Sequence, residues 1–267
     1  MRLSDEVRSL PGAGRVVTLA AGERPQKDEL CGAFAGLVAL RAGGAEVTDQ
    51  DEVALAAGTV LTEGAPSGSL PPGEKGRADF RLALPRTADP ARAGTSAIGV
   101  VRAIETLSEG ALAVVPASGE WSASVVARLL DGVRGLALVA VIANVDTGAF
   151  AAPDTPPRAL RDYLDTGLVP LWTSRWRVGH FVLVAGVLSG EEGTLVSIVD
   201  TYESLGDNGV HLQPIGHVAA ALRREGGAPG GVLLVVPAAE ADAARAVVTG
   251  SGLRAELWDN GSPAPLT

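Results

Sequence analysis

The segment of residues 180–199 constrains the fold more than any other part of the sequence. Two apolar runs rich in β-branched residues, HFVLVAGVL at 180–188 and TLVSIV at 194–199, flank the polar stretch SGEEG. Such runs around a glycine-containing turn predict an antiparallel hairpin. With the turn centred near residue 191, the numbers of paired residues sum to about 380–382. This register places Asp200 directly opposite or diagonal to His180.

The remaining apolar patterns predict a mixed α+β chain. Helical spacing of apolar residues begins at Leu30, with Asp28 as a candidate N-cap and Gly43 and Gly44 ending the helix. A Gly-, Pro- and Ser-rich stretch at 63–77 predicts a mobile surface loop. The expected helices are 30–41, 48–61, 97–107 and 122–130, and the expected strands are 15–20, 111–116 and 136–145.

The chain has 267 residues, enough for one large domain or two small ones. Its last part has its own pattern, a strand at 232–236, a helix at 241–249 and a strand at 254–258. We therefore expect a main domain at 1–222 and a β-α-β extension at 223–267 that packs on it.

Charge and composition exclude several classes of function. The net charge is −9 and no run of Lys or Arg stands out, so we expect neither a nucleic-acid nor an anionic-membrane partner. No apolar run reaches the roughly 18 residues of a spanning helix, and the first ten residues do not resemble a signal peptide. A cytoplasmic protein is expected. The single cysteine excludes an internal disulfide, and we expect no metal and no cofactor.

Cys31 is the first candidate for chemistry. It begins the predicted helix, where partial positive charge favours a thiolate, and Gly32 leaves the adjacent backbone open. The alternative is a small buried hydrophobic residue.

His180 and Asp200 are the second candidate. A carboxylate beside an imidazole fixes its tautomer and stabilises its protonated form. The alternative is a surface ion pair without function. The other histidines, His211 and His217, have no spacing typical of metal ligands and are expected in surface or loop positions.

Two short blocks resemble a known family. The segment PQKDELCGAFAGLVALR at 25–41, followed by GHFVLVAG and SIVDTY, is similar to papain-like cysteine peptidases. The nearest likeness is to bacterial leader-peptide peptidases that cut after double glycine, and to their stand-alone relatives. The resemblance spans roughly residues 20–215 and implies a helix that bears the nucleophile, packed on a mainly antiparallel sheet. In two places the family pattern is altered, since Gln26 lies one residue closer to the cysteine and Thr201 replaces a common proline.

The resemblance also implies roles. Cys31 is the nucleophile, His180 the base and Asp200 its orienting partner, while Gln26 and the Cys31 N–H stabilise an oxyanion. The implied activity is a peptidase or amide hydrolase that acts on a small peptide through an acyl-thioenzyme, in the maturation of a peptide product.

Two alternatives stay open. One is an acyltransferase or cyclase that works with a carrier or precursor peptide, and the other is a catalytically silent peptide-binding module. On the papain-like interpretation, Trp172, Arg175 and Trp176 lie on the rim of the cleft and bind an aromatic or carboxylate-bearing substrate. The alternative is that they pack the approach to the strand.

Overall fold

One mainly antiparallel sheet organises the chain. The structure, a computed structural model, describes residues 3–64 and 70–262. Its principal sheet has the order β4-β9-β5-β6-β7-β8, with the short β1 also paired to β6. These strands are β1 (Arg8–Ser9), β4 (Leu112–Ala117), β5 (Ala140–Asp146), β6 (Gly179–Ser189), β7 (Thr194–Val199), β8 (Val210–Pro214) and β9 (Gly231–Pro237). The prediction of an α+β fold is confirmed.

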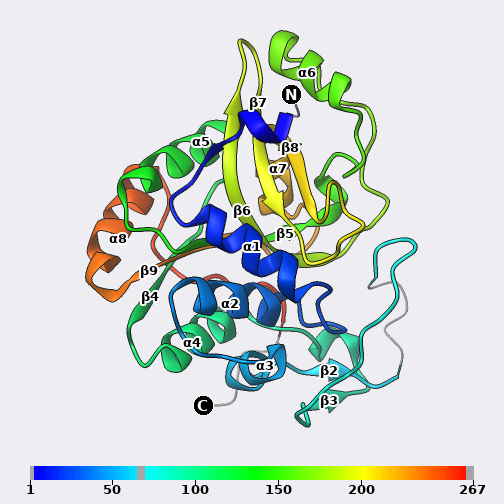
Figure 1. The fold of residues 1–267 in the computed structure, drawn as a ribbon, viewed down its shortest axis with the longest axis vertical. Coiled ribbons are helices and arrows are strands. Elements are labelled where there is room, and N and C mark those ends of the chain that lie inside the picture. The colour runs from blue at the N-terminus through cyan, green and yellow to red at the C-terminus, as the bar shows by residue number, and fades with distance from the viewer. Residues whose placement is uncertain (1–2, 65–69, 263–267) are drawn as a thin grey trace.

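Helices pack against the sheet in two groups (Figure 1). Helices α1 (Ala13–Glu23), α2 (Cys31–Ala42), α3 (Gln50–Ala57) and α4 (Ala97–Leu107) contact one another, and α1 and α2 contact β6. Helices α5 (Ala123–Gly132), α7 (Ile215–Arg223) and α8 (Ala241–Gly250) form the second group. In Figure 1, α1 lies in front of the sheet and α7 behind it.

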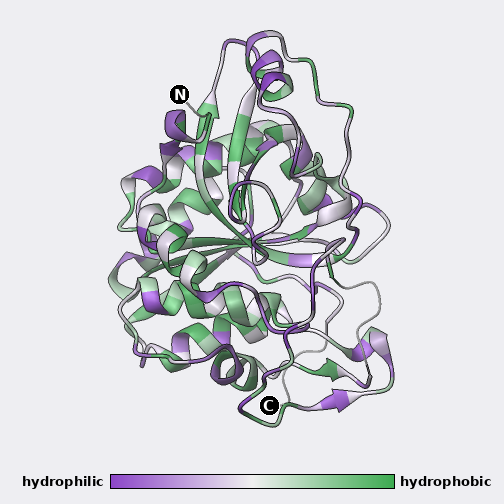
Figure 2. Cartoon of the chain, turned by 45° about the vertical axis from the view of Figure 1, so that its right-hand side comes forward, coloured by the Kyte–Doolittle hydropathy of each residue, from purple (hydrophilic) through white to green (hydrophobic). Residues whose placement is uncertain are grey.

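Smaller elements complete the chain. Helix α6 (Pro157–Thr166) contacts β7 and β8, while β2 (Leu61–Thr62) and β3 (Arg86–Thr87) form a separate parallel pair. The strands of the main sheet are mostly hydrophobic (Figure 2). Most of their residues are buried, as expected for a sheet covered on both faces.

Helix α2 is the central helix of the core. Its side chains are buried nearly all round, including Phe34, Leu37 and Leu40, and Gly43 ends it as predicted. The predicted N-cap is wrong. Leu30 occupies that position without a side-chain cap, because Asp28 instead accepts a hydrogen bond from the backbone N–H of Arg77 at 2.8 Å. The first turn of α2 therefore begins at Cys31 with its N–H groups uncapped by a side chain.

The register of the predicted hairpin depends on a β-bulge. Near the turn, Ser189 pairs with Thr194, and beyond an irregularity between Val184 and Gly186 the pairing becomes Val184 with Ile198. The sum of paired numbers thus changes from 383 to 382. A one-residue change of register moves a side chain to the other face of a sheet. The bulge therefore brings His180 and Asp200 to the same face, diagonal to each other.

Two sequence-based elements are wrong, and a third is shorter than expected. Residues 15–20 lie within α1, because Ala13, Val16 and Ala20 are buried at helical spacing and this packing overrides the strand preference of the valines. The helix expected at 48–61 is the shorter α3, capped by Asp49. Residues 254–258 form no strand; Arg254 makes one isolated bridge to Ser118, and Trp258 packs beside Gly231. Of the loop expected at 63–77, residues 65–69 lie outside the described residues.

The C-terminal residues contribute an internal strand to the main sheet. Strand β9, expected in an extension at 223–267, pairs with β4 on one side and β5 on the other. It is an internal strand of the same sheet that carries His180 on β6. Within the described residues, no helix is long and apolar enough to cross a membrane.

Candidate active site

Cys31, His180 and Asp200 meet where the head of α2 faces the sheet. His180 is the second residue of β6, and Asp200 follows the last residue of β7. His180 Nε2 lies 2.9 Å from Asp200 Oδ1, and both side chains are 2% exposed. The Cys31 thiol lies close enough to the His180 side chain for hydrogen bonding to affect the pKa of both groups. Because Asp200 is bonded to Nε2, Nδ1 is the His180 ring nitrogen available to the Cys31 thiol.

The site favours a thiolate beside an imidazolium. Burial raises the pKa of the Cys31 thiol, but the hydrogen bond and charge of His180 and the N–H groups of Phe181 and Gly32 outweigh it, so the pKa is lowered. Burial lowers the pKa of His180, whereas the charge and hydrogen bond of Asp200 raise it to about 10 overall. Burial likewise raises the pKa of Asp200, but His180 and His211 bring it below its usual value. Both shifts favour the charged pair, a Cys31 thiolate beside a His180 imidazolium.

Asp200 is also held from its other side. Its Oδ2 lies 3.3 Å from His211 Nε2, and its Oδ1 accepts the Thr201 N–H at 2.7 Å. The Gln213 side-chain amide donates to His211 Nδ1 at 2.9 Å, which fixes the tautomer that donates Nε2–H to Asp200. The expectation that His211 is a surface or loop residue is wrong, because it lies on β8 and is 4% exposed. His217 is half-buried on α7.

Gln26 lies beside the same group. The Thr201 hydroxyl donates to Gln26 Oε1 at 2.7 Å, and the Gln26 N–H donates to the Thr201 carbonyl at 3.1 Å. Oε1 of Gln26 is thus occupied by the Thr201 hydroxyl. The Nε2 group of the same amide has no hydrogen-bond partner within the described part of the chain, so it is free to donate to a group bound in the pocket that Gln26 lines. Thr201 thus orients the side chain of Gln26.

Gln26, Cys31 and His180 line a pocket of about 550 Å³. Trp176 lines it too, 6% exposed, with its ring 4.7 Å from that of His180 in an edge-on arrangement. Trp172 is 54% exposed, and neither it nor Arg175 is among the pocket residues. Of the three rim residues expected from the sequence, only Trp176 lies at the site. The pocket is lined by Gln26, Glu29, Cys31, Thr62, Glu63, Pro90, Ala93, Gly94, Thr95, Asn144, Trp176, Val178, Gly179, His180, Phe181, Arg224, Asn260 and Ser262.

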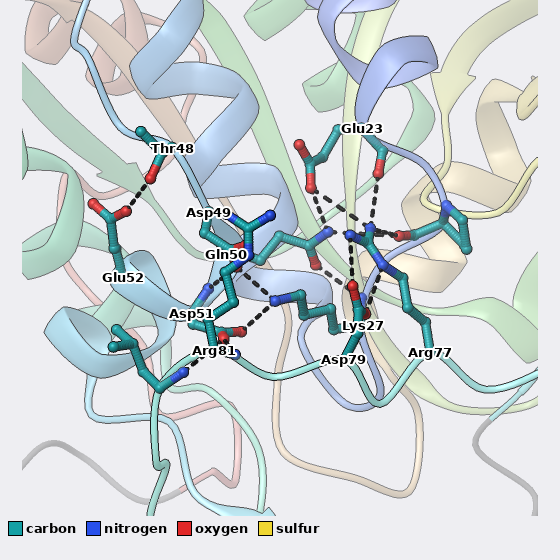
Figure 3. A network of polar contacts seen from close by, with 12 residues as sticks. Glu23, Lys27, Thr48, Asp49, Gln50, Asp51, Glu52, Arg77, Asp79 and Arg81 are labelled. Atoms are coloured by element: carbon teal, nitrogen blue, oxygen red, sulfur yellow. Dashed lines mark hydrogen bonds and ion pairs between the residues drawn. The ribbon is translucent and has the colours of Figure 1, made fainter.

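A buried polar network fixes the segment that leads into α2 (Figure 3). Lys27 is fully buried, and its Nζ lies 2.7 Å from Asp49 Oδ1 and 3.0 Å from Asp51 Oδ1. Its backbone N–H donates to Gln50 Oε1 at 2.8 Å. Gln26 and Cys31 lie on either side of this anchored residue, so the network sets the position of both.

Removing the Thr201 hydroxyl is expected to disturb oxyanion stabilisation. With Thr201→Val, acylation of Cys31 by 4-nitrophenyl acetate should slow by roughly 10-fold, because Gln26 loses the bond that orients it. Alkylation by iodoacetamide forms no oxyanion and should change far less. Thr201→Ser retains the hydroxyl and should restore acylation. Equal losses in both reactions, or equal behaviour of the two variants, would contradict this role for Thr201.

Sequence reasoning missed the supporting residues of the site. Asn144 is the lone polar residue in the apolar run at 136–145, which is the signal that the sequence offers, and the structure shows it buried at 2% exposure. Its Nδ2 donates to the His180 carbonyl at 3.4 Å, and its Oδ1 accepts from Arg224 at 3.0 Å. No group of metal-ligating side chains occurs in the part of the chain that the structure describes.

Comparison with known proteins gives one match. Residues 10–259 match a protein family described as a family of unknown function (DUF6885). No curated protein and no solved structure matches the chain.

Proposed function

Because the chain belongs to the DUF6885 family, whose function is unknown, we propose its function from its own site: a cysteine-dependent peptidase or amide hydrolase of papain-like type. The observation that carries this proposal is the arrangement of the half-buried Cys31, at the uncapped start of α2, with the buried His180 and Asp200. A helix-borne cysteine facing an antiparallel sheet, with histidine beginning one strand and aspartate following the next, supports the papain-like assignment.

The acylation step uses each group in turn. The Cys31 thiolate attacks the substrate carbonyl carbon, an S–C bond forms, and the carbonyl oxygen becomes an oxyanion. The Cys31 N–H at the head of α2 and Gln26 Nε2 are the donors placed to stabilise that charge. His180 then gives its Nδ1 proton to the leaving nitrogen, the C–N bond breaks, and a thioester on Cys31 remains.

Deacylation regenerates the site. His180, now neutral, accepts a proton from water as the water oxygen attacks the thioester, and the carboxylic acid leaves while the thiolate returns. Asp200 keeps the imidazole oriented throughout and stays ionised. If an amine takes the place of water, the same steps make an acyltransferase or cyclase, which is the second candidate function. Its acyl acceptor is an amine of a carrier or precursor peptide.

An activated ester tests the proposal without knowledge of the natural substrate. Incubation with 4-nitrophenyl acetate should release 4-nitrophenolate in a burst and leave one acetyl group on Cys31, measured by mass spectrometry. Cys31→Ala should show neither, and its fold should survive because alanine suits a helix start. Added amines that take the acetyl group faster than water would favour the transferase. A wild-type chain with no burst and no adduct would indicate a silent binding module.

A further inference from the structure

Arg224 is a cation in the same pocket as Cys31. It follows the last residue of α7, is half-buried, and lines the pocket together with Gly179 and His180. Within the described residues, no carboxylate lies within salt-bridge distance of its guanidinium. Asp146 acts on its charge from beyond that distance, so the guanidinium has no direct acidic partner in the described part of the chain.

Only one of the three guanidinium nitrogens of Arg224, Nη1, donates hydrogen bonds within the described part of the chain. Nη1 donates to Asn144 Oδ1 at 3.0 Å and to the Asn260 carbonyl at 3.1 Å, which accounts for both of its hydrogens. Nη2 lies over Gly179, where an added Cβ would come within 2.7 Å of it. The Nε and Nη2 hydrogens, the pair that binds a carboxylate in bidentate fashion, have no acceptor in the described part of the chain.

The backbone of Arg224 adds an independent observation. Its φ of 50° and ψ of 56° place it in the left-handed region at the end of α7, a position where glycine is favoured. A side chain makes this backbone conformation unfavourable for a non-glycine residue. The arginine at this strained position directs its charge into the pocket, and strain of this kind gathers at ligand-binding sites.

We propose that Arg224 binds a carboxylate of the acyl substrate next to Cys31, so that the enzyme acts on carboxylate-bearing peptides. The inference rests on the proposed function and deepens it. Asn144 and Asn260 hold the guanidinium, while its free edge receives the anion. Glu29 also lines the pocket. Its carboxylate accepts hydrogen bonds from the Thr62 N–H at 2.7 Å and the Thr62 hydroxyl at 2.8 Å, and it forms no ion pair with Arg224.

A matched pair of thiol probes tests the proposal. 4-Maleimidobutyrate carries a carboxylate and 4-maleimidobutyramide carries a neutral amide of the same shape, and both alkylate Cys31. The wild-type chain should react with the anionic probe at least about 10-fold faster, through tighter initial binding. Arg224→Gln should abolish this preference, and Arg224→Lys should keep part of it. Arg223→Gln is the control, because it removes the same charge from a neighbour bonded to the Trp121 carbonyl and Glu225.

The outcomes separate this inference from the proposed function. A preference for the anionic probe that survives Arg224→Gln, or is lost equally in Arg223→Gln, overturns the carboxylate site. If Arg224→Gln slows alkylation by both probes equally, the carboxylate site is also overturned. That result indicates that Arg224 only supports the position of Cys31. A wild-type Cys31 no faster than free cysteine with the neutral probe contradicts the proposed function. Acetyl-Gly-Gly carries only a terminal carboxylate, and acetyl-Asp-Gly-amide carries only a side-chain carboxylate. The peptide that better protects Cys31 from the probes shows which kind of carboxylate Arg224 binds.

Discussion

Replacing His180 with glutamine is expected to slow alkylation of Cys31 by iodoacetamide roughly 10- to 100-fold near pH 6. In the wild-type chain, burial raises the pKa of the thiol, and His180, with the N–H groups of Phe181 and Gly32, outweighs this effect and lowers it. Without it, burial dominates and the pKa rises, so only a small fraction of Cys31 is ionised at that pH. The higher intrinsic reactivity of a more basic thiolate offsets part of the loss.

The matched control for this experiment is His217→Gln. His217 is half-buried on α7, and its Nδ1 has no partner within the described residues. The same substitution there should leave the alkylation rate of Cys31 within about twofold of wild type, as expected for a site that makes no contact with the thiol. A His180→Gln rate as high as that of the control would contradict the thiolate–imidazolium pair.

Lys27→Met is expected to lower the free energy of unfolding by about 3–5 kcal/mol. The substitution removes the ammonium that lies between Asp49 and Asp51 and leaves two carboxylates close together with little access to water. Asp51 Oδ2 still accepts the backbone N–H groups of Arg81 and Leu82, which limits the loss. Urea unfolding followed by circular dichroism measures it.

Arg254→Gln is the control for the Lys27 experiment. Arg254 pairs with Glu256 at 3.3 Å, but both side chains are about 70% exposed. A pair in water contributes about 0–1 kcal/mol, so this variant should unfold close to wild type. If Lys27→Met cost no more than Arg254→Gln, the buried network would not be what anchors the segment between Gln26 and Cys31.

The sequence predicted those parts of the site that depend on local patterns. Apolar spacing located the helix that begins at Cys31, and the hairpin pattern placed Asp200 near His180. The contact between these two residues nevertheless depends on the bulge near Ala185, and nothing in the spacing of the two runs indicates that extra residue. The prediction succeeded because its range of registers included the one that the bulge produces.

What the sequence did not predict depends on contacts between distant segments. The sequence predicts a surface or loop position for His211. Its bond to Asp200 cannot be predicted from local patterns, because it forms only when β8 pairs with β7. Arg224 reaches the pocket because β9 inserts between β4 and β5, which brings the end of α7 close to Asn144. In residues 15–20, the valines favour a strand by themselves, and packing against the core makes them helical.

The dependence of Cys31 alkylation on pH tests the central claim most directly. We expect the alkylation rate to reach a plateau below the pKa of a free thiol, about 8.5, because the pKa of Cys31 is lowered. A second rise is expected as His180, with its pKa raised to about 10, loses its proton and the thiolate becomes more nucleophilic. A single transition at or above the pKa of a free thiol would contradict the account.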